Sequence, residues 1–132
     1  MKILPITALV SVAVTLTLTT LLGTGLAHAD LVTISQLLDR YFEEGGRRYS
    51  DANGSELWKD LCSSCHGAGP RDGGHDTTTS HPLPSLKVDG RPNFTLDGDG
   101  IDRHLEEICR QRMERPCEAQ EKGDLLVHIV VG

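Results

Sequence analysis

Apolar residues recur at helical spacing in the segment 33–46, TISQLLDRYFEEGG. They follow an i, i+3, i+4, i+7, i+8 pattern, formed by Ile34, Leu37, Leu38, Tyr41 and Phe42. Such a pattern is typical of one apolar face of a helix. Thr33 is placed to cap the start of this helix, and Gly45 is placed to end it.

Three further segments have the same character. They carry apolar stripes made of Leu57, Trp58 and Leu61 in 51–62, of Ile101, Leu105, Ile108 and Cys109 in 100–112, and of Ala119, Leu125, Leu126, Ile129 and Val130 in 118–132. Asp51 and Asp99 are plausible caps. Gly123 weakens the last helix by about 1 kcal/mol relative to Ala. No strand alternation or internal repeat occurs, so the pattern predicts an all-α domain of about four short helices.

The segment 67–100 lacks this periodicity and is rich in Gly, Pro, Thr and Asp. It is expected to form a long loop, which is unusual in a small domain unless the loop has something to pack against.

The first residues have the pattern of an export signal. After Lys2 no charged residue occurs until Asp30, and Ala27-His28-Ala29 offers small residues where signal peptidase reads. We therefore expect residues 1–29 to be a cleaved signal peptide and 30–132 to be the mature domain, which would be periplasmic. A retained membrane anchor is the alternative, because the apolar run is long enough to span a bilayer.

Charge and composition exclude several classes of function. The formal net charge is −6, and no block of Lys and Arg is long enough to follow a nucleic-acid backbone. The order of residues contains no Ser-His-Asp arrangement and no Gly-rich phosphate loop, so nothing indicates an enzyme. The stretch LDGDGIDRHLEE superficially resembles a calcium loop, but Ile101 falls on a ligand position. A turn and a helix cap are favoured there.

Candidate chemistry lies in Cys62-Ser63-Ser64-Cys65-His66. A C-x-x-C-H run is the attachment motif of c-type haem, in which both thiols add to the vinyl groups and the histidine binds iron. A zinc site would need a second ligand pair at knuckle spacing, and a thioredoxin-type pair would need a βαβ pattern. The sequence thus predicts one covalent haem c, held by Cys62 and Cys65 with His66 as the proximal iron ligand.

The other two cysteines, Cys109 and Cys117, are expected to form a disulfide with each other, which an exported domain permits. A redox-active pair is the alternative. Arg110, Arg112 and Arg115 form a small basic cluster beside them, suited to a haem propionate, an acidic redox partner or simply solvent.

The chain resembles a known family through several stretches. Residues 52–67 are similar to the helix and haem motif of class I cytochromes c. PLPS (82–85), RPNFT (91–95), HLEEICRQRMERPC (104–117) and EKGDLL (121–126) resemble the small cytochromes called SHP, the sphaeroides haem protein. The Cys-x7-Cys run followed by Glu-Lys-x-Asp is the discriminating part.

The resemblance implies a class I cytochrome fold and an unusual haem. In SHP an asparagine is the sixth iron ligand and leaves on reduction, so that the ferrous haem binds O₂ or NO. The family's redox partners are thought to be a dihaem cytochrome c and a b-type membrane cytochrome. The asparagine directly precedes the first disulfide cysteine, a position that Ile108 occupies here.

The sixth ligand therefore stays open at the level of the sequence. Met113, the only methionine after residue 30, is one candidate and would make an ordinary electron carrier. A site without a strong protein ligand is the second, with Ile108 as an apolar distal wall. A histidine is the third, chosen among His75, His81, His104 near the edge of its apolar stripe, and His128 on a solvent-facing position.

Overall fold

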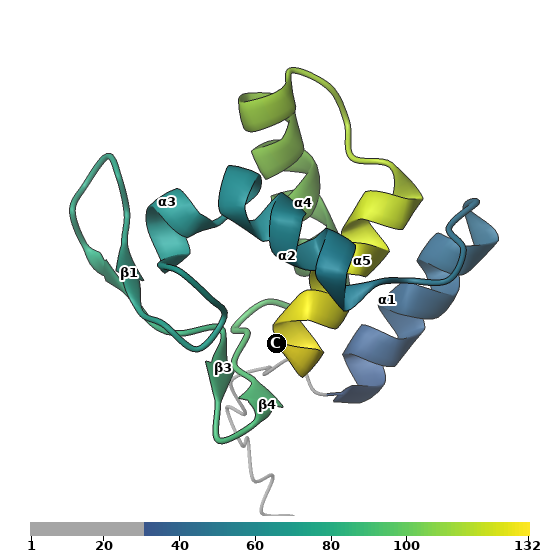
Figure 1. Cartoon of the computed structure of the whole chain (residues 1–132), viewed down its shortest axis with the longest axis horizontal. Helices are drawn as coiled ribbons and strands as arrows, with labels where there is room; N and C mark the ends of the chain where they lie inside the picture. Colours follow the sequence, from purple (N-terminus) through teal and green to yellow (C-terminus); the bar gives the residue numbers. More distant parts are fainter. Residues whose placement is uncertain (1–30) are drawn as a thin grey trace, which may run out of the picture.

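The computed structural model describes residues 31–132, and the predicted signal peptide lies outside them. The helices are α1 (Leu31–Glu43), α2 (Asp51–Leu61), α3 (Ser63–His66), α4 (Gly98–Met113) and α5 (Ala119–Val131). Figure 1 shows α2 crossing α5 at the centre, with α1 on one side and the connection between α3 and α4 on the other. The prediction of an all-α domain is confirmed, with α3 as a fifth, very short helix. Between residues 31 and 132, no helix is long and apolar enough to cross a membrane.

The crossing of α2 and α5 depends on a glycine. A Cβ atom at Gly54 would overlap the carbonyl oxygen of Asp124 and lie 2.6 Å from the Cβ of His128. Asp124 is itself buried, and its carboxylate accepts hydrogen bonds from the backbone N–H of Ser50 at 2.7 Å and from Gln120 at 2.8 Å. The two helices therefore approach closely, and a buried carboxylate of α5 fixes the chain at the start of α2.

Helix α1 buries a narrower face than its sequence pattern suggests. Ile34, Leu37 and Tyr41 are buried, whereas Phe42 is 63% exposed. At about 100° per residue, Phe42 lies roughly 80° around the helix from Ile34, at the edge of the apolar stripe. The inclusion of Phe42 in the core face was therefore wrong.

Three expected helix caps were wrong. Helix α1 begins at Leu31, so Thr33 lies within it, and the caps of α2 and α4 lie one and two residues before the expected positions. The side chain of Ser50, not Asp51, accepts from the N–H of Asn53 at 3.3 Å. Asp97, not Asp99, accepts from the N–H of Gly100 at 2.7 Å. In both cases the capping residue has the extended backbone that allows its side chain to reach the first free N–H groups.

The expected long loop contains two small antiparallel hairpins. The first pairs β1 (Gly74–His75) with β2 (Pro82–Leu83), and the second pairs β3 (Lys87–Val88) with β4 (Arg91–Pro92). The buried Lys87 side chain donates to the carbonyl oxygen of Val130 at 2.5 Å. Because strands of two residues leave no alternating pattern, the sequence could not show them.

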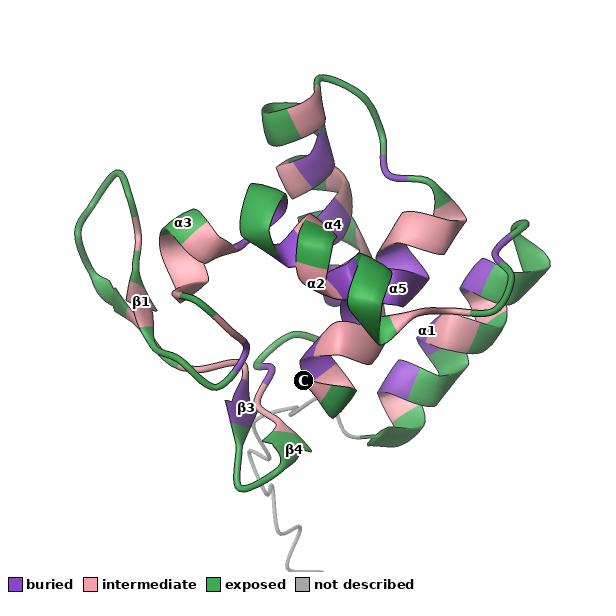
Figure 2. Ribbon diagram, viewed as in Figure 1, coloured by how far each residue is buried: buried purple, intermediate pink, exposed green. Residues whose placement is uncertain are grey.

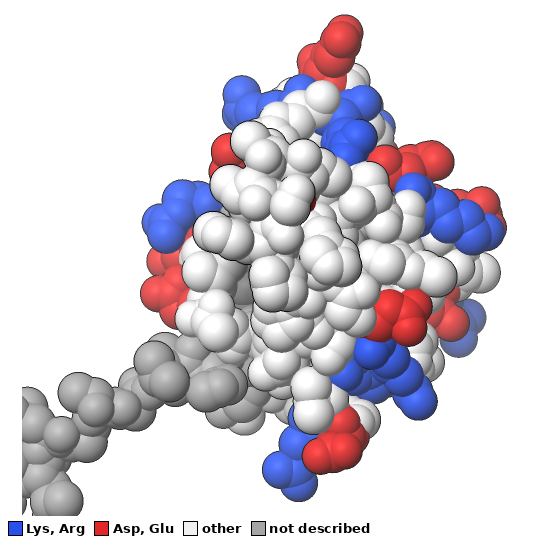
Figure 3. Space-filling view, turned by 90° about the vertical axis from the view of Figure 1, so that its left-hand side faces the viewer, with Lys and Arg blue, Asp and Glu red and all other residues white. Residues whose placement is uncertain are grey.

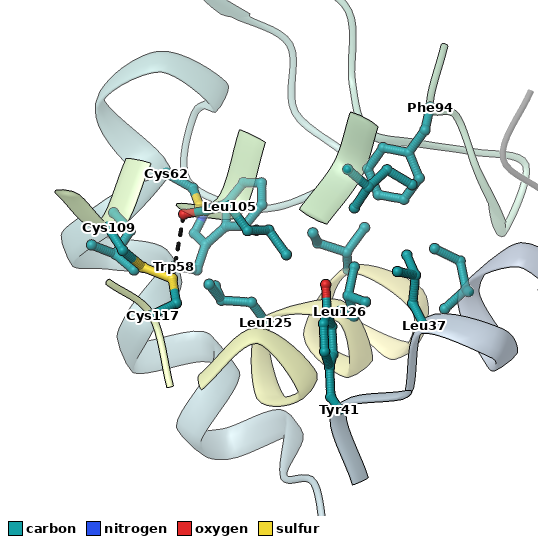
Figure 4. Packing of buried hydrophobic residues seen from close by; sticks show 14 residues of the cluster. Leu37, Tyr41, Trp58, Cys62, Phe94, Leu105, Cys109, Cys117, Leu125 and Leu126 are labelled. Atoms are coloured by element: carbon teal, nitrogen blue, oxygen red, sulfur yellow. Dashed lines mark hydrogen bonds between the residues drawn. A yellow bond between two sulfur atoms is a disulfide. The ribbon is translucent and has the colours of Figure 1, made fainter. Parts of the chain in front are cut away.

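One hydrophobic core joins α1, α2, α4 and α5. Figure 2 shows the buried residues on the facing sides of these helices, and Figure 4 shows Trp58, Leu105 and Leu125 near the Cys109–Cys117 disulfide. Cys109 and Cys117 form a disulfide between the end of α4 and the start of α5. Both are buried, with Cys117 Sγ 3.3 Å from the carbonyl oxygen of Leu105, so the predicted cross-link is part of the core.

Candidate functional site

The predicted site residues Cys62, Cys65 and His66 lie on the single turn of α3 and the residue before it. Trp58 of α2 fixes the end of this turn, because its indole N–H donates to the carbonyl oxygen of Gly67 at 3.1 Å. On the other side, the backbone of Gly74 lies so close that a Cβ atom there would overlap the carbonyl oxygen of Cys65. The turn is therefore held between a buried tryptophan and the first hairpin.

Two adjoining hollows open beside α3. An apolar one of about 200 Å³ runs inward between α4, α5 and the loop before α4, and a more polar one of about 660 Å³ lies toward Cys65 and Arg112. Five residues line both hollows: Cys62, His66, Leu83, His104 and Ile108. The two spaces together fall in the range of cofactor sites, and the apolar walls of the inner hollow suit a large flat apolar group.

The two thiols have different surroundings. Burial, with a smaller contribution from Cys65, raises the pKa of the Cys62 thiol to about 12. At Cys65 burial also opposes ionisation, but contacts with Ser64 and Thr77, each 3.8 Å from Sγ, and the charge of Arg112 outweigh it, so the pKa is lowered. Cys65 is consequently the more readily ionised of the two thiols.

One ring nitrogen of His66 is buried without a partner in the described part of the protein. Its Nδ1 atom is buried and makes no hydrogen bond to any residue between 31 and 132. Burial lowers the pKa of His66, and the neighbouring charge of His104 lowers it further. A neutral imidazole is therefore favoured, which is the form that binds a metal ion.

The structure separates the candidates for the sixth ligand. Ile108 lines both hollows, as its place on the apolar stripe suggested, and so does His104. Met113 is the last residue of α4 rather than part of the following loop, and its sulfur lies 3.7 Å from Nη2 of Arg115. It is not among the residues that line the hollows.

The remaining histidines lie away from these walls. His75 and His81 are exposed in the first hairpin and the connection within it. His128 was expected to face solvent, but its ring lies 5.9 Å from that of Trp58 and its Nδ1 is 2.7 Å from a carboxylate oxygen of Asp51. The close approach of α2 to α5 covers this side chain, so that expectation was wrong.

The arginines do not act as one basic cluster. Arg112 donates to the hydroxyl of Ser64, Arg115 pairs with Glu121 at 2.5 Å, and Arg110 lies 4.0 Å from Glu106.

On the face that carries β1, shown in Figure 3, charged side chains lie around the edge and leave the centre nearly free of them.

Sequence reasoning missed residues from the loop that complete the hollow. Leu86, Phe94 and Leu96 line its apolar part, and the side chain of Asn93 donates to the carbonyl oxygen of Ser85 at 3.0 Å, across the base of the second hairpin. The family-like stretches PLPS and RPNFT fall on this wall, which was the available signal.

Most of the chain matches one known protein family. Residues 38–129, more than two thirds of the chain, match the model of a family described as a domain of unknown function, DUF1924. The chain belongs to the DUF1924 family. No curated protein matches it.

Solved structures share the fold of this DUF1924 domain at low sequence identity. A structure described as oxidised SHP, an oxygen-binding cytochrome c, has a TM-score of 0.61 and 21% identity, covering 75% of this chain and 96% of the other. The crystal structure of oxidised cytochrome c″ from Methylophilus methylotrophus gives 0.64 and 17%, covering 76% and 94%. The solution structure of that cytochrome gives 0.65 and 16%, covering 78% and 96%. The prediction of a small cytochrome c-like fold is therefore confirmed.

Proposed function

We propose that this protein is an exported c-type cytochrome that carries one covalent haem c and takes part in electron transfer. The observation that carries the proposal is the position of Cys62, Cys65 and His66 on one turn that opens onto an apolar hollow. The likeness of this fold to that of cytochromes c, including one described as oxygen-binding, supports this assignment.

The residues present fit a haem. Both cysteines are free of disulfide bonds, and Cys62 and His66 line both hollows. The buried Nδ1 of His66 lacks a hydrogen-bond partner among the described residues, consistent with a ring whose orientation serves a ligand. Bound there, the haem would supply an iron that cycles between two oxidation states.

The protein's own groups would hold this haem and shield it from water. Cys62 and Cys65 would anchor it, and His66 would bind the iron on one side. Ile101, Leu105 and Leu126 would cover its apolar surface from α4 and α5. In such a site, axial ligand and burial set the reduction potential.

Gas binding is the finer part of the proposal. Ile108 has no ligating atom and lines both hollows, so the position at which the SHP resemblance expects asparagine cannot close the iron. We infer that the distal ligand is exchangeable and that the reduced protein binds small diatomic gases such as CO, NO or O₂.

The proposed redox partner also follows from the resemblance to SHP. A periplasmic protein would exchange electrons with another haem protein, such as a dihaem cytochrome c or a b-type membrane cytochrome. The weakly charged centre of the β1 face would allow contact with a partner without strong dependence on salt.

Acid–acetone extraction of the protein, purified after export with a cytochrome c maturation system, tests the central claim. The haem should remain with the polypeptide, and Cys65→Ala should leave at most one thioether bond. A double Cys109→Ala, Cys117→Ala variant is the matched control, because it removes two cysteines and should keep covalent haem. Free extraction of haem from the wild type would overturn the assignment.

A further inference from the structure

The boundary between the two hollows is the place where a group anchored by α3 must lie, because its anchoring residues line both spaces. Of the five residues shared by the two linings, Leu83 and Ile108 offer only carbon atoms. Cys62 and His66 belong to the attachment motif. Among the described residues shared by the two linings, His104 is then the one outside the motif whose side chain carries a ligating atom.

The position of His104 on α4 supports this role. His104 and Ile108 are four residues apart, so they lie on the same face of the helix, one turn and about 5.4 Å along its axis from each other. Both line the spaces that His66 lines from α3. The imidazole of His104 can therefore reach the space into which an asparagine at position 108 would project.

The other candidates are held elsewhere. The Met113 sulfur lies beside Arg115 at the far end of α4, within the segment closed by the disulfide. His75 and His81 belong to the first hairpin and line neither hollow. His128 is paired with Asp51 and lines neither hollow.

We propose that His104 is the second axial ligand of the haem iron, opposite His66, and takes the place of the SHP-type asparagine from one helical turn earlier. This inference rests on the proposed haem site. It makes the oxidised protein a bis-histidine cytochrome and requires an incoming gas to displace a side chain.

Both ends of α4 are held in place, and this limits the ways in which the His104 side chain can leave the haem iron. Asp97 caps the N-terminus of the helix, and the disulfide of Cys109 holds its C-terminal part to the segment before α5. His104 itself is exposed and makes no side-chain hydrogen bond to another residue in 31–132. Its departure can therefore occur by side-chain rotation, without movement of the helix.

The test uses the haem-loaded protein and its His104→Ala variant, with His81→Ala and Met113→Leu as controls. The wild-type ferric protein should show a low-spin bis-imidazole signal in electron paramagnetic resonance and lack the absorption band typical of methionine–iron ligation. His104→Ala should become high-spin, and added imidazole should restore the low-spin signal. Both controls should keep the wild-type spectrum.

CO binding by the reduced protein gives a second readout. If His104 occupies the iron about 90% of the time, its removal should raise the apparent affinity for CO about tenfold. The wild-type rate should level off at high CO concentration, and the His104→Ala rate should rise linearly.

An unchanged spectrum in His104→Ala, or a low-spin state lost in Met113→Leu, would refute the assignment. Should His104→Ala fail to accumulate, His104→Gln gives the same comparison with a side chain of similar polarity. Wild-type protein without covalent haem would instead contradict the proposed function, so the two failures are distinguishable.

Discussion

The indole N–H of Trp58 donates to the carbonyl oxygen of Gly67, the residue that directly follows the proposed haem motif. Gly67 has a positive φ of 80°, and a Cβ atom at this position would lie 2.8 Å from Cβ of Asp72. The tryptophan thus fixes the point at which the chain leaves α3 and turns into the first hairpin.

Replacing Trp58 with Phe should therefore destabilise the fold by about 1–3 kcal/mol, because the Gly67 carbonyl loses its donor and the indole site is only partly refilled. Urea denaturation followed by circular dichroism measures the change. Lys59→Ala, at the neighbouring exposed position, is the control and should cost less than about 1 kcal/mol. Equal effects from the two variants would contradict the role given to Trp58.

Gly54→Ala offers a test in which helix propensity and packing predict opposite signs. Propensity alone favours Ala over Gly by about 1 kcal/mol in a helix. The structure predicts destabilisation by about 1–3 kcal/mol, since the added methyl overlaps the Asp124 carbonyl oxygen of α5. Thermal denaturation decides the sign, and Ser55→Ala controls for a change at the next position of α2.

Lys122 is a buried cation between two carboxylates. Its Nζ lies 3.1 Å from Asp102 and also pairs with Glu106, and the side chain is 7% exposed. Lys122→Ala should cost about 3–5 kcal/mol, because it leaves partly buried carboxylates without their partner. Lys59→Ala again provides an exposed comparison. A loss below 1 kcal/mol would mean that these carboxylates are solvated.

The ion pairs around Lys122 also predict that the stability of the fold depends on pH. Burial raises the pKa of Asp102, but hydrogen bonds from Tyr41 and Lys122 outweigh it and lower the pKa below its usual value. A lowered folded-state pKa contributes stability that is present above the unfolded pKa and is lost as the pH falls through the folded pKa. Unfolding free energies measured from pH 6 to 2 should decline below about pH 4. The decline should be shallower in Asp102→Asn.

The disulfide and the proposed haem attachment would together account for all four cysteines. Thiol titration of the denatured, unreduced, haem-loaded protein should find no free thiol. The Cys109→Ala, Cys117→Ala variant should lose about 2–3 kcal/mol of stability in the loop-entropy model and keep its haem spectrum. A change in reduction potential with unaltered stability would instead favour a redox-active pair.

The sequence alone determined where the longer helices lie, and it predicted the chemistry of the motif. Apolar spacing located α1, α2, α4 and α5, because each buries a face several turns long and the period of 3.6 residues is visible over that length. Cys62, Cys65 and His66 were recognisable because haem attachment requires them to be neighbours in the chain. The pairing of Cys109 with Cys117 was likewise local.

Only the tertiary structure decided which side chains meet across the hollow. The sequence pattern placed Ile108 on the apolar stripe and His104 near its edge, and Met113 looked suitable by its order in the chain. Their distance from His66 depends on how α4 packs against α3 and the loop, which no local pattern encodes. Gly123 shows the same limit. In the sequence it is only a residue of low helix propensity within α5, whereas in the structure a Cβ atom there would overlap the ring of Tyr49. The cost of a glycine is local, whereas the contact that requires it comes from a segment more than 70 residues earlier in the chain.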